Sequence, residues 1–87
     1  MRAVATGFDL YEAISPDVVV DLPRFTMNNL LTYEIYVGSL GDVTAVRQDG
    51  VAVTFVAVPA GTRLPIAVRR INATGTTAMN LVALYNN

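Results

Sequence analysis

Two adjacent arginines precede a stretch rich in threonine, RRINATGTT, at residues 69–77. Guanidinium groups together with the amides of a glycine-containing loop are donors that can bind phosphate or carboxylate. Neighbouring residues on a strand point to opposite faces, so we expect Arg69 and Arg70 not to form one clamp. We also expect no helix after this stretch whose N-terminus could hold phosphate. A β-turn with Gly75 at a positive φ explains the same residues, and we favour this interpretation.

Paired carboxylates are the second arrangement that could support chemistry, because two of them at a suitable separation hydrolyse glycosides. The pairs that the sequence offers are Asp9 with Glu12, Asp17 with Asp21, and Asp42 with Asp49. The first pair lies near the N-terminus, the second flanks an apolar run, and the third lies beside glycines, where aspartates stabilise turns. None of these pairs has further groups around it for acid–base work, so a small hydrolase is the weakest hypothesis.

Three residue types that supply much of enzyme chemistry are absent from the sequence, namely histidine, cysteine and lysine. Their absence excludes Ser–His triads, imidazole or thiolate zinc ligands, disulfides and Schiff-base lysines. We therefore predict that the protein is not an enzyme, with no catalytic residues, no cofactor and no metal site.

Aromatic residues form the third group of interest. Tyr33 and Tyr36 are predicted on opposite faces of one strand, so at least one must face solvent or a partner. Aromatic side chains are enriched in protein interfaces, which is our first interpretation. The alternatives are that Tyr33 is a core residue with Tyr36 simply exposed, or that the rings stack on a carbohydrate. The residues that we predict to contact another subunit or a capsid are Phe8, Tyr11, Phe25, Tyr36, Arg69 and Tyr85.

The composition predicts permanent self-association. Charged residues make up 15% of the 87 residues and apolar residues 53%, whereas about 25% charged residues is typical of soluble domains. A chain this small has a high ratio of surface to volume, so a monomer would expose much apolar area. The net charge of -1 argues against nucleic-acid binding. No apolar stretch reaches the ~18 residues of a membrane helix, and we expect neither a membrane partner nor a signal peptide.

Short β-prone segments separated by Gly, Pro, Asn and Asp predict the fold. We expect an all-β, compact single domain at residues 17–87, preceded by an N-terminal arm at residues 1–16. Its architecture would be a β-sandwich or a jelly-roll-like barrel of about six to seven antiparallel strands. The strands are predicted at residues 17–22, 28–37, 42–47, 51–58, 62–71 and 80–85.

Three details of these strands are also predicted. In residues 28–37, alternation places Leu31, Tyr33, Ile35 and Val37 on one face, and in residues 51–58 it places Val51, Val53 and Phe55 inward. Residues 48–50, QDG, predict a tight hairpin. Pro65 cannot donate to a ladder, so it predicts a strand edge or a bulge.

Several blocks of the second half, in order, resemble a group of short virion proteins of tailed phages and gene transfer agents. The blocks are YVG-x-x-GDV at residues 36–43, DG at 49–50, VTF at 53–55, VPAGT-x-LPI at 58–66, a basic pair at 69–70, ATGTTA at 73–78 and ALY at 83–85. Similar proteins form the base of head spikes on the capsid.

The resemblance implies a virion protein that is assembled in the host cytoplasm and attached to the capsid exterior as a small symmetric ring. Its implied partners are further copies of itself, in a pentamer or a trimer, the major capsid protein, and possibly a spike fibre protein. Before the first YVG block this sequence departs from the family, so a decoration or cement role at other symmetry axes stays open. A carbohydrate-binding β-sandwich module is the alternative hypothesis.

Overall fold

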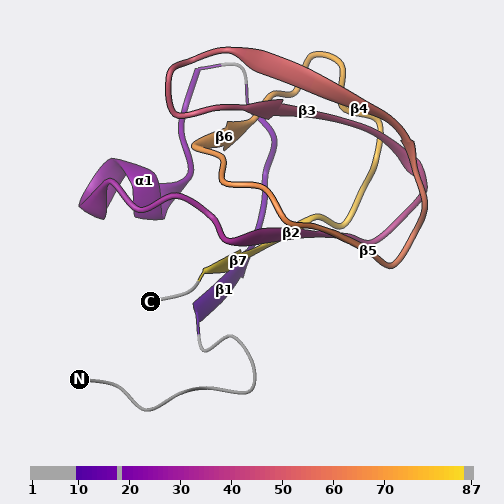
Figure 1. Cartoon of the computed structure of the whole chain (residues 1–87), viewed down its shortest axis with the longest axis horizontal. Helices are drawn as coiled ribbons and strands as arrows, with labels where there is room; N and C mark the ends of the chain where they lie inside the picture. The colour runs from indigo at the N-terminus through magenta and orange to yellow at the C-terminus, as the bar shows by residue number, and fades with distance from the viewer. Residues whose placement is uncertain (1–9, 18, 86–87) are drawn as a thin grey trace.

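The computed structural model describes residues 10–17 and 19–85, which form two antiparallel sheets that face each other across a core (Figure 1). The strands are β1 (Leu10–Ala13), β2 (Glu34–Val37), β3 (Gly41–Val46), β4 (Ala52–Val58), β5 (Thr62–Leu64), β6 (Arg70–Ile71) and β7 (Val82–Tyr85), with helix α1 (Pro23–Asn28) between β1 and β2. The all-β prediction, with six to seven antiparallel strands, is thus confirmed.

Sheet A contains four strands in the order β1-β7-β2-β5, and it lies at the bottom of Figure 1. Ile35 and Val37 point from β2 into the core and are fully buried, whereas Tyr36 between them is exposed. This part of the predicted alternation is confirmed. Tyr33 lies before β2 and is 54% exposed, so it does not share the buried face of Ile35 and Val37, and the alternative that Tyr33 is a core residue is wrong.

Sheet B contains three strands in the order β4-β3-β6 and lies at the top of the same view. The predicted QDG hairpin joins β3 to β4: the Gly50 amide donates to the Arg47 carbonyl, and Gly50 has a φ of 91°. A positive φ at the last position of such a loop is what glycine allows without strain. A second irregularity follows at Ala57, where the register between β3 and β4 shifts and φ is 56°.

The core lies between the two sheets. It is built from branched aliphatic residues on the inner faces, closed at the C-terminal end of β7 by a tyrosine, and its fully buried members include Ile35, Val37, Val43, Ile71, Ala83 and Tyr85. Helix α1 contributes no buried residue. At six residues it is short, and the described part of the chain contains no helix long and apolar enough to cross a membrane.

The predicted N-terminal arm is wrong for the part that the structure describes. Residues 10–13 form β1, which pairs along its full length with β7, and the Ile14 amide donates to the Leu81 carbonyl at 2.9 Å. Ile14 is 8% exposed and belongs to the core. Residues 1–9, the rest of that arm, lie outside the described residues.

The segment at residues 17–22 was predicted as a strand, but it forms no regular strand. It runs beside β6 through three backbone hydrogen bonds, which join Asp17 to Ile71 and Ala73 and join Leu22 to Arg69. Because this pairing is irregular, Val19 and Val20 remain 74% and 65% exposed. Helix α1, which follows immediately, was not predicted. Pro23 occupies its first turn, where the missing N–H costs nothing.

The predicted strand at residues 62–71 is two strands in two different sheets. β5 ends at Leu64, immediately before Pro65, and the chain then crosses to sheet B and forms β6. The expectation that Pro65 marks a strand edge is therefore confirmed, because β5 is the edge strand of sheet A and ends there.

Candidate functional site

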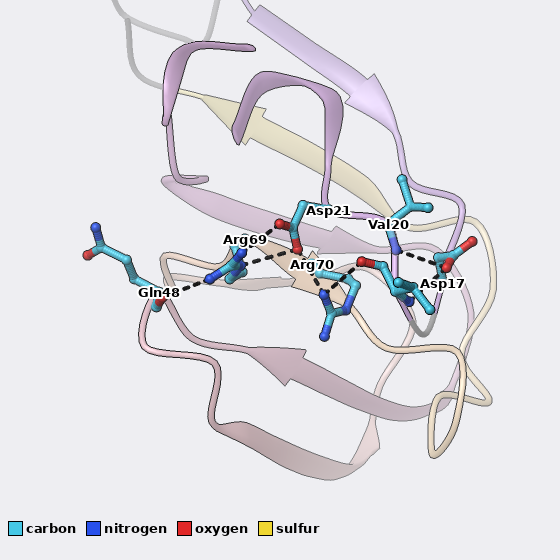
Figure 2. Close-up of polar contacts among 7 residues, drawn as sticks. Asp17, Val20, Asp21, Gln48, Arg69 and Arg70 are labelled. Atoms are coloured by element: carbon cyan, nitrogen blue, oxygen red, sulfur yellow. Dashed lines mark hydrogen bonds and ion pairs between the residues drawn. The ribbon is translucent and has the colours of Figure 1, made fainter. Parts of the chain in front are cut away.

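A cluster of three charged side chains, Asp21, Arg69 and Arg70, joins the segment before helix α1 to the start of β6 (Figure 2). Arg69 donates to both oxygens of the Asp21 carboxylate, from Nη2 at 2.7 Å and from Nε at 3.2 Å. Arg70 Nη1 donates to Asp21 Oδ1 at 2.9 Å. The expectation that these arginines could not meet at one site is therefore wrong. Arg69 lies just before β6, so strict strand alternation does not apply to it.

Both arginines also donate to main-chain carbonyl groups, whereas Arg70 Nε is buried and has no hydrogen-bond partner among the described residues. Arg69 Nη1 donates to the Gln48 carbonyl at 3.1 Å, and its guanidinium lies 4.6 Å from the centroid of the Phe25 ring. Arg70 Nη1 also donates to the Val19 carbonyl at 3.3 Å. The Arg69 hydrogen bond, helped by the charge of both arginines and opposed by partial burial, lowers the pKa of Asp21. The cluster thus clamps three segments of this chain together, and a carboxylate of the chain already occupies the place of an anion.

The ATGTTA turn serves a different contact from the arginines. Gly75 has a φ of 92°, as predicted for a turn, and the Thr76 amide donates to the Ala73 carbonyl. The turn packs on β3: Thr76 Oγ1 accepts from the Thr44 amide at 2.9 Å, and a Cβ added to Gly75 would lie 2.5 Å from Thr44 Oγ1.

Two sequence blocks of the resemblance, GDV and ATGTTA, meet in this contact. The Asp42 amide donates to Thr77 Oγ1, while the Asp42 carbonyl accepts from the amides of Thr77 and Ala78. A Cβ on Gly41 would lie 2.5 Å from the Ala78 nitrogen, so only glycine permits this approach. The Asp42 carboxylate accepts from the Ala57 amide at 2.8 Å and so holds the bulge of β4. These blocks therefore specify how one loop seats on sheet B.

Other carboxylates of the described residues accept hydrogen bonds or form ion pairs within the chain. Asp17 accepts from the amides of Val19 and Val20, Asp49 pairs with Arg47 at 2.7 Å, and Glu12 lies 3.3 Å from the Tyr85 hydroxyl. Asp9 lies outside the described residues. No group of three or more acidic residues within the described ranges could hold a metal ion.

Two of the predicted interface residues, Tyr11 and Tyr36, lie on the outer face of sheet A. The strand register puts Tyr11 opposite Leu84, which in turn pairs with Glu34, two residues before Tyr36. Tyr11 is 64% exposed and Tyr36 is 38% exposed. The structure therefore places both rings on one partly exposed face of sheet A.

The other predicted interface residues lie elsewhere. Phe25 and Arg69 are half-buried and stack on each other at the charged cluster. Tyr85 has no exposed surface, so its prediction as an interface residue is wrong. The ring fills the end of the core, and its burial raises the pKa of the hydroxyl, as does the neighbouring Glu12 carboxylate. Phe8 lies outside the described residues.

Sequence reasoning missed the exposure of β4. Of its seven residues only Val58 is buried, and Val53 and Val56 are 43% and 73% exposed, while Val51, just before the strand, is 48% exposed. The prediction that these side chains point inward is thus wrong for Val51 and only partly met by Val53, whereas Phe55 does pack against the core. The strand overhangs the sandwich, so its inner face is partly open. The missed signal was VAVTFVAV itself, which has no charged residue although it lies at an edge.

Comparison with solved structures gives an informative similarity. No protein-family model matches the chain, and no curated protein matches it. Among solved structures, the chain is similar to one described as the capsid of a native gene transfer agent particle computed with C5 symmetry. The two chains are 27% identical and superpose with a TM-score of 0.76, over 94% of this chain and 90% of the other. This similarity agrees with the sequence resemblance to virion proteins of phages and gene transfer agents.

Proposed function

We propose that this protein is a structural component of a phage or phage-like virion. The observation that carries the proposal is the similarity, over 94% of the chain, to a chain of a gene transfer agent capsid. Because sequence identity and the fold agree over nearly the whole of both chains, the proposal does not depend on one motif.

Within the virion, this protein forms a homo-oligomer on the capsid exterior, as a head spike base or as a decoration protein. Its partners are copies of itself, in a pentamer or a trimer, the major capsid protein, and in the spike base role a fibre protein. Support comes from large apolar side chains that the described subunit leaves exposed, notably Tyr11, Leu40, Val56 and Met79. Surfaces of this kind mark interaction sites in small proteins.

The proposed role includes no catalysis, no cofactor, no membrane and no nucleic acid. The charged cluster supports this, because Arg69 and Arg70 are neutralised in part by Asp21 and hold the subunit together. A structural protein needs rigid surfaces rather than a reactive group, and the ion pairs and glycine contacts supply rigidity.

The experiment that tests the proposal is native mass spectrometry of the purified chain, followed by co-sedimentation with capsids assembled from the major capsid protein of the same particle. A pentamer that binds these capsids supports a spike base at fivefold vertices. A capsid-binding trimer supports a cement protein at threefold sites. A monomer that does not sediment with capsids would overturn the proposal.

A carbohydrate-binding module is the second candidate, and one observation favours it. Tyr11 and Tyr36 are exposed on the same face of sheet A, where rings could stack on sugars. Glycan-array binding by the isolated subunit that is lost in both Tyr11→Ala and Tyr36→Ala would favour this candidate over the virion role.

A further inference from the structure

Strand β4 is an open sheet edge with an unusual composition. It pairs with β3 on one side and is the terminal strand of sheet B. Natural edge strands are commonly protected by charges, by proline or by short length. β4 has seven residues, contains no charge and no proline, and exposes Val53 and Val56. Its one irregularity, the bulge at Ala57, lies near its end and leaves the first four residues regular.

The register shows which main-chain groups of β4 face outward. The Arg47 amide donates to the Val51 carbonyl, so this pair is hydrogen-bonded, and hydrogen-bonded and non-hydrogen-bonded pairs alternate from there. Ala52 and Thr54 fall on non-hydrogen-bonded pairs. Their N–H and C=O groups therefore point away from β3, toward the open edge.

Strand β1 provides an equivalent open edge in sheet A. It pairs only with β7 among the described strands. Because the Ile14 amide donates to the Leu81 carbonyl, the same alternation turns the main-chain groups of Tyr11 and Ala13 outward. Both edges thus present two outward-facing residues with one residue between them, which is the spacing of a ladder.

The two edges are complementary and lie on different sides of the subunit. β4 runs along the top of the molecule in Figure 1 and β1 lies at the bottom. β4 carries no charge and exposes valines, while the β1 edge exposes the Tyr11 ring, an aromatic group of the kind enriched at interface centres. Two different surfaces that fit each other produce a head-to-tail contact, which closes into a ring when the rotation between neighbouring copies closes.

We propose that β4 of one copy pairs edge to edge with β1 of the next copy, which continues sheet B of one subunit into sheet A of its neighbour. This inference rests on the proposed homo-oligomer and names its contact surface. The four residues of β1 give a ladder of only about 13 Å. The flanking apolar side chains, Val53 and Val56 on β4 and Tyr11 on β1, complete the contact.

The test uses two charged variants of the full chain, one on each edge, and a matched control. Val56→Lys places a charge on β4, and Tyr11→Lys places one on the β1 edge. Val19→Lys is the control, because Val19 is 74% exposed against 73% for Val56 and lies outside both edges. Far-ultraviolet circular dichroism verifies that each variant is folded. The native mass of each is then measured over a range of concentrations.

We expect V56K and Y11K each to weaken assembly by about tenfold or more, and V19K to leave it unchanged. Mixing V56K with Y11K is the decisive step. Each variant retains one intact edge, so the mixture forms a 1:1 dimer that cannot close into a ring.

Three outcomes would overturn the inference while the proposed oligomer stands. The first is full assembly of V56K. The second is full assembly of Y11K, which would indicate that β4 pairs with β4. The third is that V19K also loses assembly. Ala52→Pro is a second β4 variant that adds no charge and removes an outward-facing N–H at the first position of the strand, where proline is tolerated. It should weaken assembly as V56K does. A wild-type monomer would contradict the proposed homo-oligomer itself.

Discussion

At the scale of single residues, Asp21 determines how the charged cluster works. Its carboxylate accepts from two arginines that the sequence places next to each other, and its side chain is 16% exposed. Strand alternation could not predict this, because Arg69 precedes the two-residue strand β6 and both side chains are long. Nor does the sequence show that Asp21, 48 positions away from Arg69, is the shared partner.

Replacing Asp21 by asparagine should destabilise the subunit by about 2 kcal/mol at neutral pH, since charge-assisted hydrogen bonds to both arginines are weakened. Urea unfolding at a fixed protein concentration measures this. Asp49→Asn is the matched control, because the Arg47–Asp49 pair is exposed at 58% and 52%. Its loss should cost less than about 1 kcal/mol. Equal effects of the two substitutions would show that the cluster is no more important than a surface pair.

The contribution of Asp21 should also depend on pH. Its pKa in the folded chain is lowered below the ordinary 3.8, so the ionised form is favoured by folding. The stabilisation is then complete above the ordinary value and is lost as the pH falls through the lowered pKa. Unfolding measured from pH 7 down to about pH 2 should show the wild type and D21N converging below about pH 4. A constant difference down to the lowest pH would contradict this assignment.

At the scale of elements, the contact between β3 and the loop at residues 75–80 depends on small residues. Gly41→Ala would bring a Cβ to within 2.5 Å of the Ala78 backbone nitrogen, and that loop is held by three hydrogen bonds to Asp42. We expect a loss of about 3 kcal/mol in the free energy of unfolding. Gly61→Ala is the control: its Cβ would meet nothing within 4 Å, although φ is 83°, so about 1 kcal/mol is expected. A smaller effect of G41A than of G61A would contradict the packing argument.

The elements also show what the sequence can predict. The hairpin of β3 and β4 follows from alternation and from the Asp-Gly pair, which are local signals, and both strands are found where they were expected. Residues 17–22 have the composition of a strand, but β6 is two residues long and offers them no regular ladder. The sequence did not predict β1, because its pairing with β7 joins residues about 70 positions apart and no local pattern between them indicates this pairing.

At the scale of the whole molecule, the exposed sheet edges differ in chemistry from the sites where charged side chains are paired. Ion pairs of the described chain lie within the subunit, at Asp21, at Asp49 and at Glu34 with Arg63. The edges at β4 and β1 instead present apolar side chains and main-chain groups. Assembly of this subunit should therefore depend on apolar burial and strand pairing, and little on attraction between charges.

This dependence predicts how the oligomer responds to salt. Raising the NaCl concentration from about 0.1 M to about 1 M shortens the Debye length from about 10 Å to about 3 Å and screens exposed charges. An oligomer held by β4 and β1 should keep its mass or associate more tightly, which light scattering at several protein concentrations measures. Glu34 and Arg63 form an ion pair on the outer face of sheet A, on strands β2 and β5 and thus away from the β1 edge. Dissociation at high salt would place the contact at these charges instead, and the variant Arg63→Gln would then reproduce the loss at low salt.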